Sequence, residues 1–146
     1  MSLTIAPLQA HERSAWQLLA RGYMDFYKTE KTAEDYDTAW SRLLNQDGIH
    51  GLGARRDGEL VGMAHYYFHT AVWAQTVCYL QDLFVLPTQR GQGVARALIE
   101  AVAVAAREAQ AARYYWMTQE HNATARVLYD KVAKYKGFIR YDYPLA

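Results

Sequence analysis

The stretch QDLFVLPTQRGQGVARALIEAV, residues 81–102, joins an apolar, strand-like run to a helix through a turn that contains two glycines. Pro87 cannot donate a ladder hydrogen bond, so it ends the strand. Gly91 and Gly93 leave main-chain amides unshielded at a helix N-terminus, where the helix dipole favours an anion. The junction therefore predicts either an anion site, to which Arg90 adds a charge-assisted contact, or a plain tight turn with strained dihedral angles.

Two nucleotide-binding motifs do not fit this junction. A P-loop needs a glycine, four residues and then Gly-Lys-Ser/Thr, and no such sequence is present. A dinucleotide-binding turn needs a third glycine where the chain has Arg96, and an acidic residue about 20 positions further on. Residues 109–113 are Ala-Gln-Ala-Ala-Arg instead. A nucleotide is therefore the least favoured ligand.

Length and charge predict one folded domain that covers residues 1–146. The chain is 51% hydrophobic, which suits one buried core. Sixteen basic and fifteen acidic residues give a net charge of +1, which argues against nucleic-acid binding because that function needs a basic face. A single cysteine, Cys78, and the absence of a signal-like start or a long apolar run predict a cytoplasmic protein without a membrane span.

Hydrophobic periodicity predicts an α/β (α+β) fold with a mixed, mostly antiparallel sheet, one βαβ crossover and helices on both faces. The Asp57-Gly58 pair predicts a tight hairpin turn, and Thr32 is a candidate cap of the second helix. The expected strands are 3–8, 51–56, 59–70, 77–85, 113–118 and 138–145, and the expected helices are about 11–27, 32–44, 92–109 and 122–136.

The strand at 77–85 is predicted to be central because both of its faces are largely apolar. Strict alternation places Cys78, Leu80, Asp82 and Phe84 on one face. On that face Asp82 is either a hydrogen-bonded structural carboxylate or a candidate base. Cys78 is expected to be a core residue rather than an acyl carrier.

Histidine spacing predicts no metal site. His65 and His69 share a strand face, but four residues of strand separate them by about 13 Å, too far for one ion.

Three stretches together resemble the GNAT superfamily of N-acetyltransferases. RGQGVA, residues 90–95, resembles the family signature Arg/Gln-x-x-Gly-x-Gly/Ala. LQDLFVLP, residues 80–87, looks like the family's central strand, and NATARVLYDKVAKYKGF, residues 122–138, looks like its C-terminal motif. The predicted element order is also that of the family. YYWMTQEHNATARVLYDKV, residues 114–132, is similar in particular to the histone/polyamine acetyltransferase branch.

The resemblance implies an acetyl-CoA site where the central strand splays from its parallel neighbour. The backbone of Leu83, Phe84 and Val85 would pair with the pantetheine arm as a substitute strand. Asn122 resembles the family residue that contacts the coenzyme arm, and it also suits a helix N-cap. The residues implied to hold the pyrophosphate through their amides are Arg90, Gly91, Gln92, Gly93, Val94 and Ala95.

The resemblance further implies direct acetyl transfer to an amine. Tyr129 would protonate the departing thiolate, and the alternative is a core tyrosine that satisfies its hydroxyl. The attacking ammonium must first lose a proton. Glu120, His121 and Asp82 are the candidate bases, with an ordered water as the alternative.

The acceptor site is implied to lie between the first two helices and the strand ends. Tyr23, Tyr27 and Trp73 are predicted to hold an ammonium through cation–π attraction, and simple packing also explains them. The expected acceptor is a polyamine, a lysine side chain, an amino acid or another small primary amine. A non-catalytic acyl-CoA sensor is the open alternative, and a homodimer through the tyrosine-rich C-terminal strand is expected.

Overall fold

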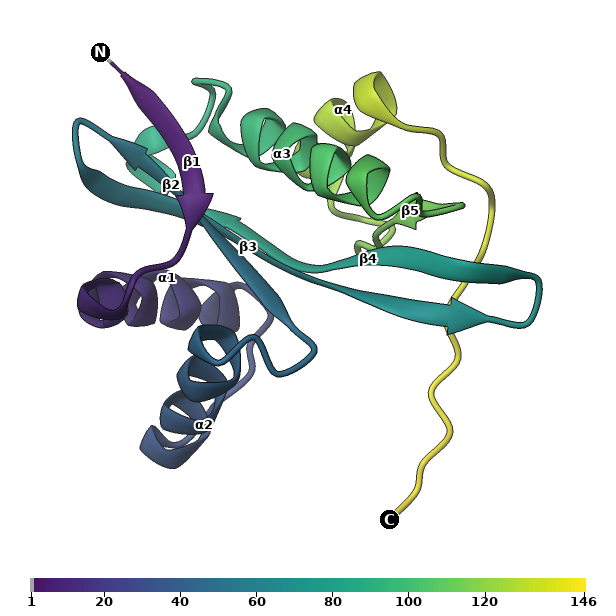
Figure 1. Ribbon diagram of the computed structural model, residues 1–146, viewed down its shortest axis with the longest axis horizontal. Helices are drawn as coiled ribbons and strands as arrows, with labels where there is room; N and C mark the ends of the chain where they lie inside the picture. Colours follow the sequence, from purple (N-terminus) through teal and green to yellow (C-terminus); the bar gives the residue numbers. More distant parts are fainter. Residues whose placement is uncertain (1) are drawn as a thin grey trace.

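The computed structural model describes residues 2–146 and confirms the predicted mixed sheet with helices on both faces (Figure 1). Five strands lie in sequence order; the first four pair antiparallel and the last pair is parallel. The strands are β1 (Leu3–Pro7), β2 (His50–Arg56), β3 (Glu59–Ala71), β4 (Ala74–Val85) and β5 (Tyr114–Tyr115). The helices are α1 (Arg13–Phe26), α2 (Ala33–Leu44), α3 (Val94–Glu108) and α4 (Ala123–Val132), with 3-10 turns η1 (Ala10–Glu12) and η2 (Pro87–Gln89).

The sheet separates two hydrophobic cores. Helices α1 and α2 cover one face, while α3 and α4 lie on the other (Figure 1). Leu98 and Val102 of α3 are completely buried in the core of the second face. Trp16 and Leu19 of α1 are 1% exposed and pack with Met63 of β3 on the first face. The crossover β4–α3–β5 is the predicted βαβ unit.

Local signals fix several boundaries as predicted. The Thr32 hydroxyl accepts a hydrogen bond from the Asp35 amide, and the Asp35 carboxylate accepts one from the Thr32 amide, so α2 begins with a capping box. Asp57 and Gly58 have φ values of 52° and 86°, the left-handed pair that a tight hairpin turn requires.

A β-bulge at Gln81 divides β4 into two halves. His65 of β3 lies opposite Asp82, and Tyr66 lies opposite Leu80, so Gln81 has no partner of its own on β3. One extra residue interchanges the two faces of the strand beyond it, because side chains alternate with a period of two.

The bulge corrects the predicted faces of the central strand. Cys78 and Leu80 pack in the core beneath α3, whereas Phe84 packs in the core beneath α1. Asp82 lies opposite His65, on the α1 side with Phe84. The prediction of one common face was therefore wrong, since it assumed unbroken alternation.

Two predicted boundaries in the C-terminal third also need correction. The expected strand at 113–118 has only two paired residues, Tyr114 and Tyr115, because the chain then turns away from β4. Asn122 precedes α4 but its side chain does not cap the helix; it donates instead to the Thr118 hydroxyl. Helix α4 ends at Val132, before the predicted stop at Gly137.

The expected final strand at 138–145 does not form. This segment runs past β4 and ends away from the sheet (Figure 1). A strand requires a neighbour with free ladder groups, and the segment pairs with none in the described part of the chain. Its large apolar side chains, each at least 68% exposed, are Phe138, Ile139, Tyr141, Tyr143 and Leu145.

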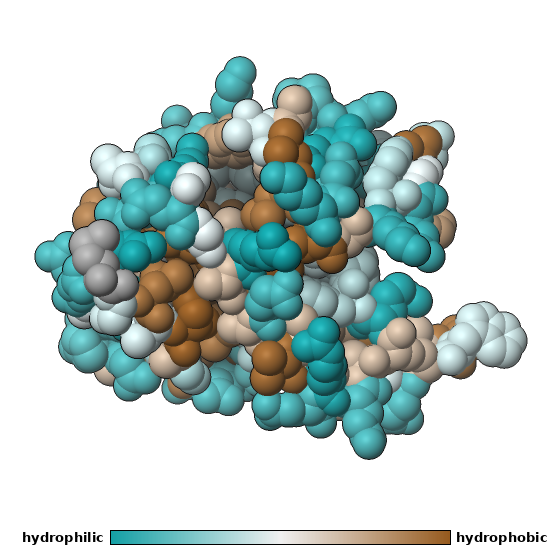
Figure 2. All heavy atoms as spheres, turned by 90° about the horizontal axis from the view of Figure 1, so that it is seen from above, coloured by the Kyte–Doolittle hydropathy of each residue, from teal (hydrophilic) through white to brown (hydrophobic). Residues whose placement is uncertain are grey.

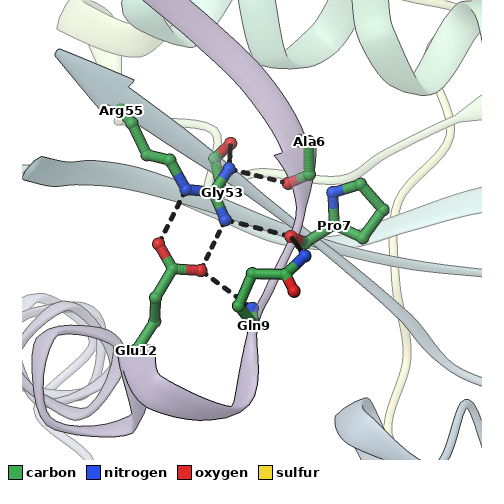
Figure 3. Close-up of polar contacts among 6 residues, drawn as sticks. All are labelled: Ala6, Pro7, Gln9, Glu12, Gly53 and Arg55. Atoms are coloured by element: carbon green, nitrogen blue, oxygen red, sulfur yellow. Dashed lines mark hydrogen bonds and ion pairs between the residues drawn. The ribbon is translucent and has the colours of Figure 1, made fainter. Parts of the chain in front are cut away.

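A buried ion pair fastens the start of α1 to the sheet (Figure 3). The Arg55 guanidinium of β2 donates to both carboxylate oxygens of Glu12 and to the carbonyl oxygens of Ala6, Pro7 and Gly53. The side chains of Glu12 and Arg55 are 7% and 12% exposed.

Opposing effects act on the Glu12 carboxyl. Burial alone would raise its pKa, but the hydrogen bonds from Arg55 and from the Gln9 amide outweigh burial and hold the pKa below its usual value. Because folding lowers this pKa, the pair stabilises the fold above about pH 4.5, the usual glutamate value, and that stabilisation is lost as the pH falls through the folded-state value.

Replacement of Glu12 by Gln should therefore lower the free energy of unfolding by about 3 kcal/mol, because it leaves Arg55 charged, buried and without its ion-pair partner. Urea unfolding at pH 7 measures this loss. As the pH falls below 4.5, the stability of the variant should also decrease less than that of the parent.

Asp37→Asn is the matched control, because it breaks the exposed Arg13–Asp37 pair. It should cost less than about 1 kcal/mol. Equal losses in the two variants would show that the Glu12 pair has no special structural role.

Candidate active site

The candidate site lies where β4 and β5 part. Their parallel pairing is limited to Cys78 with Tyr114 and Tyr79 with Tyr115. Beyond the bulge at Gln81, the edge of β4 that faces away from β3 has no strand neighbour among residues 2–146. Main-chain groups on this edge therefore have no strand partner and can pair with an extended ligand.

A small cavity lies where β4 and β5 separate. Its walls come from the C-terminal half of α1, the bulge region of β4, the chain after β5 and the middle of α4. The lining residues are Tyr23, Tyr27, Leu80, Gln81, Leu83, Trp116, Met117 and Tyr129. Three tyrosines and a tryptophan from three separate elements thus converge beside the free strand edge.

The glycine turn lies at the end of the same strand. Gly91 and Gly93 have φ values of +76° and +82°, and Gly93 is the residue that precedes the first turn of α3. A Cβ atom added at either position would meet no atom of the chain within 4 Å, so the surface of the turn is open. Unshielded amides at the start of a long helix, on an open surface, fit a diphosphate.

Arg90 fastens this turn to the strand. Its Nε donates to the Val85 carbonyl oxygen at 3.1 Å, and its guanidinium carbon lies 5.3 Å from the centre of the Phe84 ring. Val94, the first residue of α3, is 1% exposed and belongs to the core. The side chains on both sides of the two glycines therefore hold the turn in place.

Tyr129 projects from α4 into the cavity wall. Its ring contacts Trp116 edge-on at 5.5 Å between centroids. Burial, with a smaller effect from Tyr27, raises the pKa of the Tyr129 hydroxyl to about 12. The hydroxyl therefore keeps its proton throughout the neutral range and can act as a donor toward the cavity.

Asp82 does not line the cavity but belongs to a hydrogen-bonded group that neighbours Tyr23. Its Oδ2 atom is 2.9 Å from Nδ1 of His65, and Nε2 of His65 accepts a hydrogen bond of 3.0 Å from the Trp16 indole. Burial, followed by the charge of the neighbouring Asp82, raises the pKa of Tyr23 far above its usual value. The Tyr23 hydroxyl donates to the Gln81 carbonyl oxygen at 3.5 Å. Tyr23 thus connects this group with the cavity.

Some predicted site residues lie elsewhere. Glu120 and His121 are exposed in the turn before α4 and do not line the cavity. Trp73 is 95% exposed at the β3–β4 turn, the end that projects from the body of the molecule in Figure 2. Asn122 is half-buried and donates to Thr118. The acidic residues of α2 are exposed to solvent.

Sequence reasoning missed five residues of the site. Leu80, Gln81, Trp116 and Met117 line the cavity, and His65 contacts Asp82. The position of Gln81 depends on the bulge, and the spacing of His65 bears only on a metal site. The one available signal was the position of Trp116 and Met117 directly after the parallel strand.

Residues 2–146 contain no group of three histidine, cysteine or acidic residues arranged to hold a metal ion. No helix in this part of the chain is long and apolar enough to cross a membrane.

Residues 14–135 match the model of the Acetyltransferase (GNAT) family. The chain belongs to this family. It is an acetyl-CoA-dependent N-acetyltransferase, as the resemblance implied.

Curated relatives and solved structures agree with this assignment. The chain is 32% identical to D-amino-acid N-acetyltransferase HPA3 of Saccharomyces cerevisiae over 136 residues, which cover 90% of this chain and 84% of the relative. It is 30% identical to thialysine N-epsilon-acetyltransferase of Caenorhabditis elegans, over 74% of this chain and 68% of the relative.

Among solved structures, ribosomal-protein-alanine N-acetyltransferase of Brucella melitensis biovar Abortus 2308 superposes with a TM-score of 0.83 at 25% identity, over 99% of this chain and 100% of the other. Aminoglycoside N-acetyltransferase AAC(6')-Iy in complex with CoA has the same fold, with a TM-score of 0.87 at 17% identity, over 99% of this chain and 96% of the other. GNAT proteins use acetyl-CoA, which fits the free strand edge and open glycine turn described above.

Replacement of Gly93 by Val should weaken CoA binding at least about tenfold, because the side chain enters the open surface that a diphosphate would occupy and a branched residue is strained at positive φ. Isothermal titration with CoA measures the change.

Gly48→Val is the matched control for strain. Gly48 also has a positive φ, +78°, and open space around its Cβ position, but it lies in the turn between α2 and β2. Both variants should lose similar stability, whereas the control should keep the parent's CoA affinity. Undiminished affinity in Gly93→Val would argue against a diphosphate at this turn.

Proposed function

We propose that the protein acetylates a small primary amine of the amino-acid or polyamine type by direct transfer from acetyl-CoA. The observation that carries this proposal is the convergence of three tyrosine side chains on the cavity where β4 and β5 separate, one of which, Tyr23, neighbours the Asp82 carboxylate. The names of the yeast and worm relatives, which act on a D-amino acid and on thialysine, support a small amine as the acceptor.

The coenzyme would lie along β4 and end at the glycine turn. Leu83, Phe84 and Val85 would pair with its pantetheine arm through the free strand edge. The amides of residues 90–95 would receive the diphosphate at the N-terminus of α3. Asn122 would contact the arm from the start of α4. Bound here, acetyl-CoA would supply an acetyl group activated as a thioester.

Tyr129 would act as the proton donor to the sulfur of the leaving group. Burial keeps this hydroxyl protonated at neutral pH, so it is always available to donate. A hydrogen bond that strengthens as the sulfur gains negative charge stabilises the transition state more than the ground state.

Asp82 would take up the proton of the incoming ammonium. It is 19% exposed and neighbours Tyr23, which lines the cavity, whereas Glu120 and His121 are on the outer surface. The N–H bond of the ammonium breaks as the carboxylate oxygen gains the proton, and the neutral amine then has a lone pair for attack. Tyr23 and Tyr27 would hold the ammonium with their ring faces. No metal ion is needed for this chemistry.

The test of this function is incubation with acetyl-CoA and a panel of amino acids, diamines and polyamines while released thiol is measured. Turnover of at least one small amine is expected. Tight binding of acetyl-CoA without turnover of any amine would instead favour the acyl-CoA sensor. A cytoplasmic location stays a prediction that is supported by the single, buried Cys78.

Tyr129→Phe should lower kcat about 100-fold, because it removes the proton donor, and should leave CoA affinity unchanged. Steady-state kinetics and CoA titration measure the two effects.

Tyr114→Phe is the control, because the Tyr114 hydroxyl donates to the Ile99 carbonyl oxygen beneath α3 and does not line the cavity. It should lose about 1 kcal/mol of stability and keep the parent's kcat. An unchanged kcat in Tyr129→Phe would remove Tyr129 from the mechanism.

The protein would also form a homodimer through residues 138–145. This segment is extended and exposes five large apolar side chains that the rest of the chain leaves uncovered. A second copy can cover such a segment by strand pairing or packing across a two-fold axis.

Phe138→Ser combined with Tyr141→Ser should shift the dimer toward monomer, which sedimentation velocity at several concentrations measures. Leu18→Ser combined with Val104→Ser is the matched control, because these apolar side chains are also exposed but lie on α1 and α3. The control pair should remain dimeric. A monomeric parent at every concentration would contradict the proposal.

A further inference from the structure

Trp16, His65 and Asp82 form a buried chain of hydrogen bonds between α1, β3 and β4. The Trp16 Nε1 atom donates to His65 Nε2 at 3.0 Å, and His65 Nδ1 lies 2.9 Å from Asp82 Oδ2. Trp16 and His65 are 1% and 8% exposed. Water therefore has little access to either nitrogen of the imidazole.

The tryptophan determines which nitrogen of the imidazole carries the proton. An indole N–H can only donate, so Nε2 of His65 must accept and cannot itself hold a proton. The ring proton is then on Nδ1, where it points at the Asp82 carboxylate. A second proton on Nε2 would place two donors face to face, so the contact with the indole keeps Nε2 as an acceptor.

We propose that His65 is a positioning residue for Asp82 and that Trp16 fixes its tautomer. The inference rests on the proposed function, in which Asp82 receives the proton of the amine. The hydrogen bond from Nδ1 occupies Oδ2 and fixes the plane of the carboxylate. Oδ1 is then left to meet the ammonium of the acceptor.

The remaining surroundings of Asp82 agree with this role. No lysine or arginine of residues 2–146 forms an ion pair with it. The titratable neighbours are Tyr23 on α1, His65 on β3 and Tyr79 on β4, and burial raises the pKa of both tyrosines, so neither is charged at neutral pH. The carboxylate therefore lacks a fixed cation of its own, and the acceptor can supply that positive charge.

Two substitutions of His65 separate positioning from simple packing. His65→Asn keeps an N–H group near the position of Nδ1 and can still donate to Asp82, whereas His65→Leu has a similar size and no donor. Both remove the acceptor of the Trp16 indole, so both should lower the melting temperature by similar amounts.

The catalytic outcomes should differ. His65→Leu should lower kcat/KM for the amine about 10- to 100-fold, because it frees the carboxylate that a charge-assisted hydrogen bond holds. His65→Asn should stay within about threefold of the parent, and CoA affinity should be unchanged in both, since His65 is remote from the glycine turn. Equal losses in the two variants, or none in His65→Leu, would overturn the positioning role.

Nitrogen NMR of the histidine rings tests the tautomer without turnover. In the parent, His65 should show a protonated Nδ1 and an unprotonated Nε2, and Trp16→Phe should convert this signal to a mixture of tautomers. A proton on Nε2 in the parent would overturn the proposal. If no amine is acetylated by the parent, the proposed function fails, and the NMR result still decides whether the hydrogen-bonded chain exists.

Discussion

The extra residue in β4 at Gln81 is the constraint on which the site depends. Before the bulge, β4 pairs with neighbours on both sides, and after it only β3 remains bonded to the strand. Strands stay together only while ladder groups face one another in register. The pairing between β4 and β5 therefore ends at the level of the bulge, and a gap separates the two strands beyond it.

Three functional elements follow from this local defect. The free edge of β4 offers main-chain groups, the end of the strand leads into an open glycine turn, and the interchange of faces turns Asp82 toward α1 and His65. Each element has a rigid support: Val94 in the core holds the turn, Trp16 holds His65, and the Glu12–Arg55 pair fastens the beginning of α1. The site is thus built on packed elements rather than on mobile loops.

Features encoded by neighbouring residues could be predicted from the sequence. The Asp57-Gly58 turn, the Thr32 cap and the glycine turn each depend on a few adjacent positions, and the order of elements follows from periodicity. The faces of β4 and the contact between His65 and Asp82 depend on the pairing register of two strands, which a single sequence does not specify. Residues 138–145 have the composition of a strand, but a strand also needs a neighbouring strand to pair with. Composition does not show whether the segment finds one, so the prediction of a strand was wrong.

The central claim is that the coenzyme lies along the freed edge of β4, with its diphosphate against the amides of the glycine turn. A crystal structure of the protein with CoA tests this most directly. The account predicts main-chain hydrogen bonds between the pantetheine arm and Leu83–Val85, and the diphosphate within hydrogen-bonding distance of the amides around Gly91 and Gly93. Density for CoA at any other place, with this edge and turn free of ligand, would contradict it.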